Sequence, residues 1–429
     1  MLDFAPTYKN RDFYVPAYEI KINRKELLSD VACDVMEVRY TDDVEKMDTF
    51  DITVNNWDAE KLDFKYTGSK KGLDAGADAA RSTLFDPGQE IEIWMGYFKP
   101  TTDNPTPIRM MLVGIITSLT PNFPASGSPT LKISGQNILR KFIDKQETHD
   151  YVKSDPPKGP DDHPKNRDSD IAEKIGKRGK LKYDNRPIKI VVNCSARDRE
   201  PSNEHVSQKN QYDILFLMQL ARRNSYDLVF VTKDEDNRLR NSTGCPGKLP
   251  DPPFLYFGPS TKLTRVSYLL EWGKSLIDFQ PALKTTNQVA EVTVQGWNVL
   301  TKKPIKVTVK RSDLKTSPQQ DPQRMKKLEE GFKERREIVV DEPFRDEAAA
   351  KKKAESLMEN NSKNMVTGRG STVGLPDLRA GSFIKIQGLG LTFDGRYFVK
   401  STTHTINTSG YITTFDARLE EENKKENKK

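Results

Sequence analysis

The sequence has few cysteines and histidines, and neither set has the spacing of a metal or disulfide site. The three cysteines, Cys33, Cys194 and Cys245, lie far apart, and none belongs to a Cys-x-x-Cys pair. An odd number at such spacing argues against a disulfide framework and against a structural zinc site. The four histidines, at positions 149, 163, 205 and 404, also lack a metal-ligand spacing. We therefore expect no metal and no cofactor.

Long apolar runs are also missing. No stretch approaches the ~20 apolar residues of a membrane-spanning helix, and the first residues lack the apolar segment of a secretory signal. We therefore expect synthesis in the cytoplasm without export by a standard N-terminal signal. Hydrophobic residues make up only 35% of the chain, which argues against one large core. Aromatic residues still reach 9%, which argues against wholesale disorder.

The charge balance points to no particular partner. The chain has 69 Lys and Arg against 62 Asp and Glu, a net charge of +7, and both signs are interspersed. The lysine runs at 70–71 and 351–353 are not interleaved with the aromatic side chains on which single-stranded nucleic acids stack. We therefore expect no specific nucleic-acid partner.

Residues 1–144 have the pattern of an antiparallel β domain. Apolar and polar residues alternate at 18–22 and 50–54, and strand-like runs follow at 90–97, 109–119 and 130–134. The run at 31–40 reads as a strand in which the apolar phase slips between Val35 and Met36, which suggests a bulge. Turn residues separate the strands and no long helical pattern appears. A meander or a small barrel is therefore expected, with residues 67–84 as an exposed excursion.

Residues 145–262 combine a polar loop with a small α/β module. Residues 145–170 are rich in proline and charge and predict a loop. Ser169 or Asp170 can cap a short helix that runs to Lys177, and residues 187–192 read as a strand. Residues 211–224 give the clearest helical pattern in the chain, with one broad apolar face, and a strand at 226–231 follows.

Residues 263–420 form a second β-rich region. Strand patterns occur at 276–279, 289–297, 304–309, 364–373, 382–387, 395–406 and 410–419. A helical insertion interrupts them at about 311–361, where Asp346 can cap a helix that runs to Asn360. Residues 421–429 are a charged tail. The fold class predicted for the whole chain is mostly β with an α/β insertion.

No group of residues predicts catalysis. Asp161, Asp162, Asp168 and Asp170 could supply paired carboxylates for acid–base chemistry, but the polar segment around them favours a solvated loop. Cys194, with His205 eleven positions later, has the residue types of a nucleophile and its base, yet its place at the end of an apolar strand favours a buried structural cysteine. His404 lies in a threonine-rich strand, where a structural hydrogen bond across a sheet is the simpler interpretation. The glycine pairs at 368–370 and 388–390 lie between strands, which favours turns over a phosphate-binding loop. We therefore expect a protein that is not an enzyme.

Several short segments, taken in order, resemble one protein family. The segments are DITVNNW at 51–57, FDPGQEIEI at 85–93, GIITSLTPNFP at 114–124, QYDILFLMQLARR at 211–223, WGKSL at 272–276, FQP at 279–281, VQGW at 294–297, GSFIKIQG at 381–388 and GRYFV at 395–399. Over residues 10–420 the chain resembles the late control D or tail hub proteins of phages. That family includes the baseplate hubs of contractile tails and phage-tail-like contractile injection systems, and the hub part of type VI secretion spike proteins.

The resemblance implies a structural role. It implies two small, tube-like antiparallel β-barrels per subunit and a homotrimer whose six barrels form a pseudo-hexameric ring. Such a baseplate hub adapts the sixfold tail tube to the threefold spike, nucleates tube assembly and becomes part of the assembled particle. The expected partners are the tail tube or a tube-initiator protein, a trimeric spike protein and baseplate wedge proteins. Because the chain ends after the last predicted strand, we expect the spike to be a separate polypeptide.

The remaining expectations concern packing and contacts. Trp57, Trp272 and Trp297 are expected to pack inside the barrels, and residues 67–84 and 145–170 to contact neighbouring baseplate proteins. Two alternatives stay open from the residues alone, a tail-tip cell-wall hydrolase and a β-sandwich adhesin.

Overall fold

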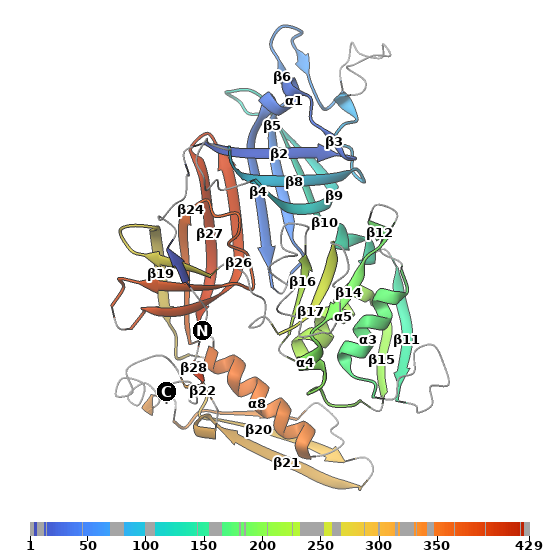
Figure 1. The fold of residues 1–429 in the computed structure, drawn as a ribbon, viewed down its shortest axis with the longest axis vertical. Coiled ribbons are helices and arrows are strands. Elements are labelled where there is room, and N and C mark those ends of the chain that lie inside the picture. Colours follow the sequence, from blue (N-terminus) through green and yellow to red (C-terminus); the bar gives the residue numbers. More distant parts are fainter. Residues whose placement is uncertain are drawn as a thin grey trace.

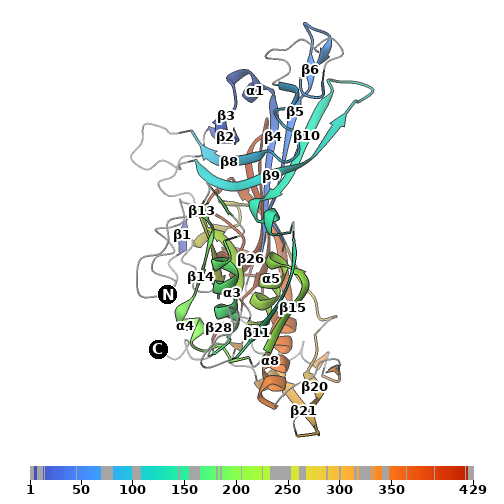
Figure 2. The same cartoon turned by 90° about the vertical axis from the view of Figure 1, so that its right-hand side faces the viewer.

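A computed structural model provides the fold, which is mostly β (Figure 1). It describes residues 4–6, 13, 15–44, 46–68, 81–98, 108–143, 145–153, 165–179, 182–183, 186–203, 205–224, 226–231, 253–259, 267–286, 288–298, 301–313, 316–317, 330–331, 333–340, 347–363, 365–390, 392–420 and 422–423. Among these residues, no helix is long and apolar enough to cross a membrane. The long axis of the molecule runs from the hairpin that contains β6 to the sheet that contains β21 (Figures 1 and 2).

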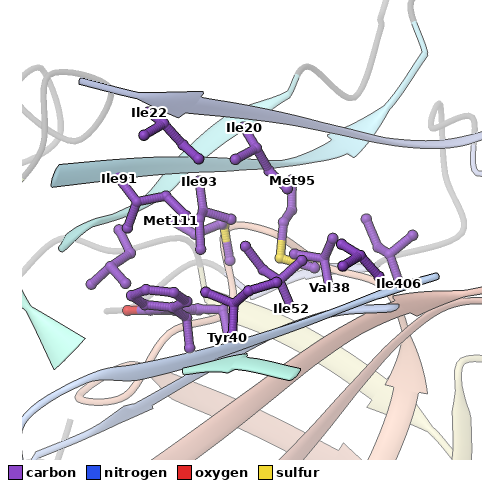
Figure 3. Packing of buried hydrophobic residues seen from close by; sticks show 14 of the residues in the cluster. Ile20, Ile22, Val38, Tyr40, Ile52, Ile91, Ile93, Met95, Met111 and Ile406 are labelled. Carbon is purple, nitrogen blue, oxygen red and sulfur yellow. The ribbon is translucent and has the colours of Figure 1, made fainter. Parts of the chain in front are cut away.

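The first β region is a curved antiparallel sheet at one end of the molecule. Its main strands are β2 (Pro16–Ile22), β4 (Val35–Asp43), β5 (Thr49–Asn55), β8 (Glu90–Tyr97), β9 (Arg109–Asn122) and β10 (Thr130–Asn137). The short elements are β3 (Lys25–Glu26), α1 (Ser29–Asp34), β6 (Trp57–Asp58) and β7 (Asp63–Phe64). Alternate residues of the main strands point inward and form one apolar core, which Figure 3 shows. The predicted strand at 31–40 is partly wrong, because Val31 lies in α1, whereas the predicted bulge is confirmed by a register shift between Val35 and Glu37.

The second β region surrounds another core. Its strands are β18 (Ser267–Glu271), β19 (Leu276–Leu283), β24 (Val366–Val373), β25 (Phe383–Gln387), β26 (Gly395–Asn407) and β27 (Gly410–Leu419). Tyr268, Tyr397 and Phe415 are among the large side chains buried in this core. Between β18 and β19 the chain makes a tight turn, in which Trp272 and Leu276 form an isolated bridge.

The two β regions share one sheet. On one side β26 pairs with β27, and on the other it pairs first with β25 and then with β4. The short β1 (Phe4–Pro6) lies parallel to β18, which brings the N-terminus to the second region. The sheet therefore runs as one open, branched sheet, and its described strands do not close into two separate barrels. Strand β26 is long enough to link the two β regions, because one of its halves pairs with β25 and the other pairs with β4.

The α/β module lies beside the first region (Figure 1). It contains the 3-10 helix η1 (Ile138–Ile143), β11 (Gln146–Val152), α3 (Asp168–Lys177), β12 (Lys182–Tyr183), β13 (Arg186–Pro187), β14 (Lys189–Val192), α4 (Cys194–Arg197), β15 (His205–Tyr212), α5 (Asp213–Arg223), β16 (Asp227–Val231) and β17 (Phe254–Gly258). The predicted helix that ends at Lys177 is confirmed, but Ser169 and Asp170 lie inside it and Arg167 is its N-cap. The helix predicted at 211–224 is confirmed as α5, whereas residues 211 and 212 belong to β15. The predicted loop at 145–170 is wrong at both ends, because β11 pairs with β15 and α3 begins at Asp168.

A smaller α/β unit lies at the opposite end from the first region. Its sheet contains β20 (Glu291–Asn298), β21 (Lys303–Lys310) and β23 (Arg336–Val339), and α8 (Glu347–Lys363) covers one face. The 3-10 helix η4 (Arg311–Asp313) follows β21. The predicted charged tail is not wholly free, because β28 (Glu422–Asn423) pairs with β22 (Thr316–Ser317).

Candidate functional site

Two of the three predicted tryptophan anchors lie on the surface. The side chains of Trp272 and Trp297 are 62% and 52% exposed. Trp57 is half-buried and packs edge-on against Phe64 of a short hairpin, with ring centres 5.6 Å apart. The prediction that Trp272 and Trp297 pack in a core is therefore wrong for the single chain. Trp297 extends from the sheet face opposite to buried Val292 and Val294, and Trp272 lies on a turn.

The junction between the two β regions holds a group of buried polar side chains. β4 and β26 run antiparallel there, and Thr403 lies opposite Thr41 with their hydroxyl oxygens 3.1 Å apart. Because this backbone ladder is continuous, the two regions cannot separate without losing sheet hydrogen bonds. Buried side chains in the interior also hold the two β regions together.

A buried ion pair crosses the junction. Nε of Arg379 lies 3.2 Å from a carboxylate oxygen of Asp42, and both side chains are only 8% exposed. The same carboxylate accepts a hydrogen bond from the backbone N–H of Ala380, at 3.0 Å, and another from the hydroxyl of Thr402. Asp42 lies on β4 and Arg379 on the segment before β25. The pair therefore joins the first region to the second.

The guanidinium of Arg379 also contacts the first core. It donates to the hydroxyl of Tyr40 at 2.9 Å and to the backbone carbonyl of Met111 at 2.7 Å. It also lies 4.7 Å from the centre of the Tyr40 ring. One cationic group thus contacts both β4 and β9. Removing one partner of such a pair leaves an uncompensated charge in the interior, which is strongly destabilising.

His404 is completely buried at the same junction. Its Nε2 lies 3.0 Å from the carbonyl oxygen of Leu378, so that nitrogen carries the proton and donates it. Its Nδ1 then accepts, with the hydroxyls of Tyr411 and Thr413 at 2.9 and 3.1 Å. Burial lowers the pKa of His404 to about 4, so the ring is neutral near pH 7. The expectation of a structural histidine that hydrogen-bonds across a sheet agrees with these contacts.

A second carboxyl group belongs to the junction. Asp48, just before β5, accepts a hydrogen bond from the Asn137 side chain at 2.9 Å. As a whole residue Asp48 is only partly buried, but its carboxyl group is enclosed enough for desolvation to dominate. Desolvation, together with the nearby charge of Asp42, raises the pKa of Asp48 to about 7. Asp48 therefore exchanges a proton close to neutral pH.

Close packing at the junction requires glycine at position 374. A Cβ atom there would lie 2.0 Å from Cγ of Tyr411. The carbonyl of Gly374 accepts a hydrogen bond from the Tyr97 hydroxyl at 2.9 Å, which ties this segment to β8.

We expect Gly374→Ala to lower the free energy of unfolding by about 1–3 kcal/mol, the usual cost of overpacking a core. The exposed turn variant Ser409→Ala is the matched control and should change it by less than about 0.5 kcal/mol. Urea unfolding followed by circular dichroism measures both. Equal stability of the two variants would show that Tyr411 moves aside freely.

The paired aspartates in the α/β module have a structural environment. Asp161 and Asp162 lie outside the described residues, whereas Asp168 and Asp170 are buried, so a solvated loop is wrong for this pair. Asp168 accepts hydrogen bonds from Arg223, at 2.8 Å, and from Asn203, at 3.0 Å. These bonds fix the start of α3 against α5.

Cysteine pairing also differs from the expectation. Cys33 is free and exposed, but Cys194 is disulfide-bonded. The expectation that the chain lacks a disulfide framework is therefore wrong for Cys194. Cys245 lies outside the described residues. His205 makes a contact of 3.0 Å with Asp150, on the exposed edge of the β11–β15 pair.

Metal chemistry finds no support in the part of the chain that the structure describes. There, no three His, Cys, Asp or Glu side chains form a group that could hold a metal ion. The residues that sequence reasoning missed are Asp42, Asp48 and Arg379, which hold strands together rather than line an open site.

Comparison with solved structures finds two tail proteins that share the fold over nearly their whole length and a type VI secretion protein that shares it over 77% of its chain. The 43 kDa tail protein of prophage MuSo2 from Shewanella oneidensis is 13% identical, with a TM-score of 0.58, and the match covers 94% of this chain and 98% of that one. The tail protein from Neisseria meningitidis MC58 is 13% identical, with a TM-score of 0.59 and coverages of 95% and 97%. The E. coli c3393 protein, a component of the type VI secretion system, is 14% identical, with a TM-score of 0.50 and coverages of 94% and 77%.

Comparison by sequence finds a match over only part of the chain. The family model described as the Alg8 N-terminal domain matches residues 258–408, which is less than half of the chain. No curated protein matches the chain. The resemblance to tail hub proteins is thus confirmed at the level of the fold, which is that of phage tail proteins.

Proposed function

We propose that this protein is the structural baseplate hub of a contractile tail or a contractile injection system. The observation that carries the proposal is the fold match with two phage tail proteins, which covers at least 94% of this chain and 97% of theirs. A match of that extent includes both β regions and the α/β module rather than one widespread domain. Fold alone does not fix function, so the physical features of the chain must also suit the role.

The junction suits a part that transmits force. A hub that moves with a tail tube must keep its two β regions in a fixed orientation. The shared ladder between β4 and β26 and the buried pair of Asp42 and Arg379 provide that rigidity. In this proposal the protein acts through the rigid connection between its two β regions and not through a reaction at a pocket.

The proposal includes the assembly implied by the resemblance. Three copies form a ring that adapts the sixfold tube to the threefold spike and nucleates the tube, with wedge proteins around it. We also propose the division of the chain into 1–144, 145–262 and 263–420. The exposed side chains of Trp272 and Trp297 become contacts to partners, because large exposed aromatics are typical anchors of interfaces. Of the loops expected to make such contacts, residues 69–80 and 154–164 lie outside the described ranges.

Electron microscopy of the protein co-expressed with its tube and spike proteins tests the proposal. We expect a threefold ring with a central channel between tube and spike. A protein that stays monomeric and binds neither partner would overturn the proposal. Cell-wall lysis by the purified protein would instead favour the hydrolase.

A further inference from the structure

One face of the β20–β21–β23 sheet packs on a helix, and the other exposes apolar side chains. Its apolar side, with Val292, Val294 and Val307, packs against α8. The opposite face, which we call the outer face, contains Trp297 and Ile338, whose side chains are 52% and 59% exposed. Ile338 lies beside Thr293 of β20, four positions before Trp297, so the two apolar groups mark two separate points of this face at which a partner could bury apolar surface.

The outer face is also basic. Lys306 and Lys310 lie on β21 in the same alternation as exposed Thr308, opposite Gln295 and Glu291 of β20. On β23, Arg336 makes an ion pair of 2.8 Å with Glu291. The two lysines therefore leave positive charge beside the apolar groups, and a complementary partner should be acidic and partly apolar.

The other end of the molecule has those properties. Residues 57–64 form the β6–β7 hairpin, which packs against the turn between β9 and β10. Phe64 contacts Phe123 edge-on, with ring centres 5.3 Å apart. Leu62 and Phe123 are 72% and 58% exposed. The same hairpin contains Asp58, Glu60 and Asp63 against a single lysine, Lys61.

These two surfaces lie at opposite ends of the long axis in both views (Figures 1 and 2). They therefore cannot meet within one copy, but they can meet between copies. We propose that the acidic β6–β7 hairpin of one copy binds the basic outer face of the β20–β21–β23 sheet of the next copy. A head-to-tail contact of this kind closes into a ring if its rotation allows and otherwise continues as a filament. Only the expectation of closure after three copies rests on the proposed function.

Charge reversal tests the contact in the full chain. We expect K306E/K310E to weaken self-association at least tenfold, measured by sedimentation at low ionic strength. E60K/D63K should weaken it equally, and the four substitutions together should restore it. The control K303E changes a lysine on the same strand but in the alternation of buried Ile305, and should leave association unchanged. Loss without restoration in the combined variant, or association that ignores all these changes, would overturn the proposal.

Crosslinking provides a second measurement that does not depend on charge. In a C33S background, Leu62→Cys with Ile338→Cys should give disulfide-linked oligomers. The control pair of Leu62→Cys with Ile277→Cys should not, although Ile277 is also 56% exposed. Equal crosslinking of both pairs, or a protein that stays monomeric even with tube and spike present, would contradict the contact. A ring that ignores the charge changes would refute this interface but leave the hub role intact, whereas a confirmed contact without tube or spike binding would refute the hub role alone.

Discussion

Replacing Arg379 with methionine is expected to lower the free energy of unfolding by about 3–5 kcal/mol, the cost of breaking a buried ion pair from one side. The substitution keeps most of the side-chain volume but leaves Asp42 as an unpaired charge beside the first core. It also removes the donors to Tyr40 and to the Met111 carbonyl. Urea unfolding followed by circular dichroism measures the loss.

Two further variants show whether charge is the cause. The double variant R379M/D42N should lose less than R379M alone, because no buried charge remains. R39M is the matched control, since Arg39 forms a surface pair with Glu37 at 3.3 Å and is 46% exposed. That control should cost less than about 1 kcal/mol. If R379M costs no more than R39M, the ion pair does not hold the junction.

The elements with a clear apolar period were predictable from sequence. The apolar residues of α5 recur on one face of a helix, and those of β2 alternate with polar residues. Either pattern is enough to predict the element from the sequence. In contrast, β11 was missed because Tyr151 and Val152 are its only apolar residues. Tyr151 alone is fully buried, and the strand owes its place to pairing with β15. Such pairing depends on a segment more than fifty positions away, which a local pattern does not contain.

The buried ion pair at the junction cannot be predicted from the sequence, for a similar reason. Asp42 and Arg379 are 337 positions apart, and nothing near either residue marks it as buried. The tryptophans show the opposite case, where a local signal was present. Trp297 alternates with Val292 and Val294, so the period of β20 already placed it on the other face.

The pH dependence of the free energy of unfolding should contain two opposing contributions, which come from Asp48 and His404 at the junction. Asp48 keeps its proton in the folded state up to about pH 7 and loses it near pH 3.8 when unfolded. Between those values the folded state binds one more proton, so this group makes the free energy of unfolding fall as the pH rises. His404 titrates at about 4 when folded and 6.5 when unfolded. The unfolded state then binds the extra proton, so this group makes the free energy of unfolding rise with pH. From about pH 4 to 6.5 the two contributions cancel.

Single substitutions remove the cancellation. Relative to the natural protein, D48N should make the free energy of unfolding rise with pH by about 1.4 kcal/mol per unit between pH 4 and 6.5. Relative to the natural protein, H404Q should make it fall by a similar amount over the same range, and this difference curve should flatten above about pH 6.5, where His404 of the unfolded state has also lost its proton. Urea unfolding at half-unit pH steps gives the difference curves, in which all other titrating groups cancel. Parallel curves for the natural protein and both variants would show that neither proton is linked to folding.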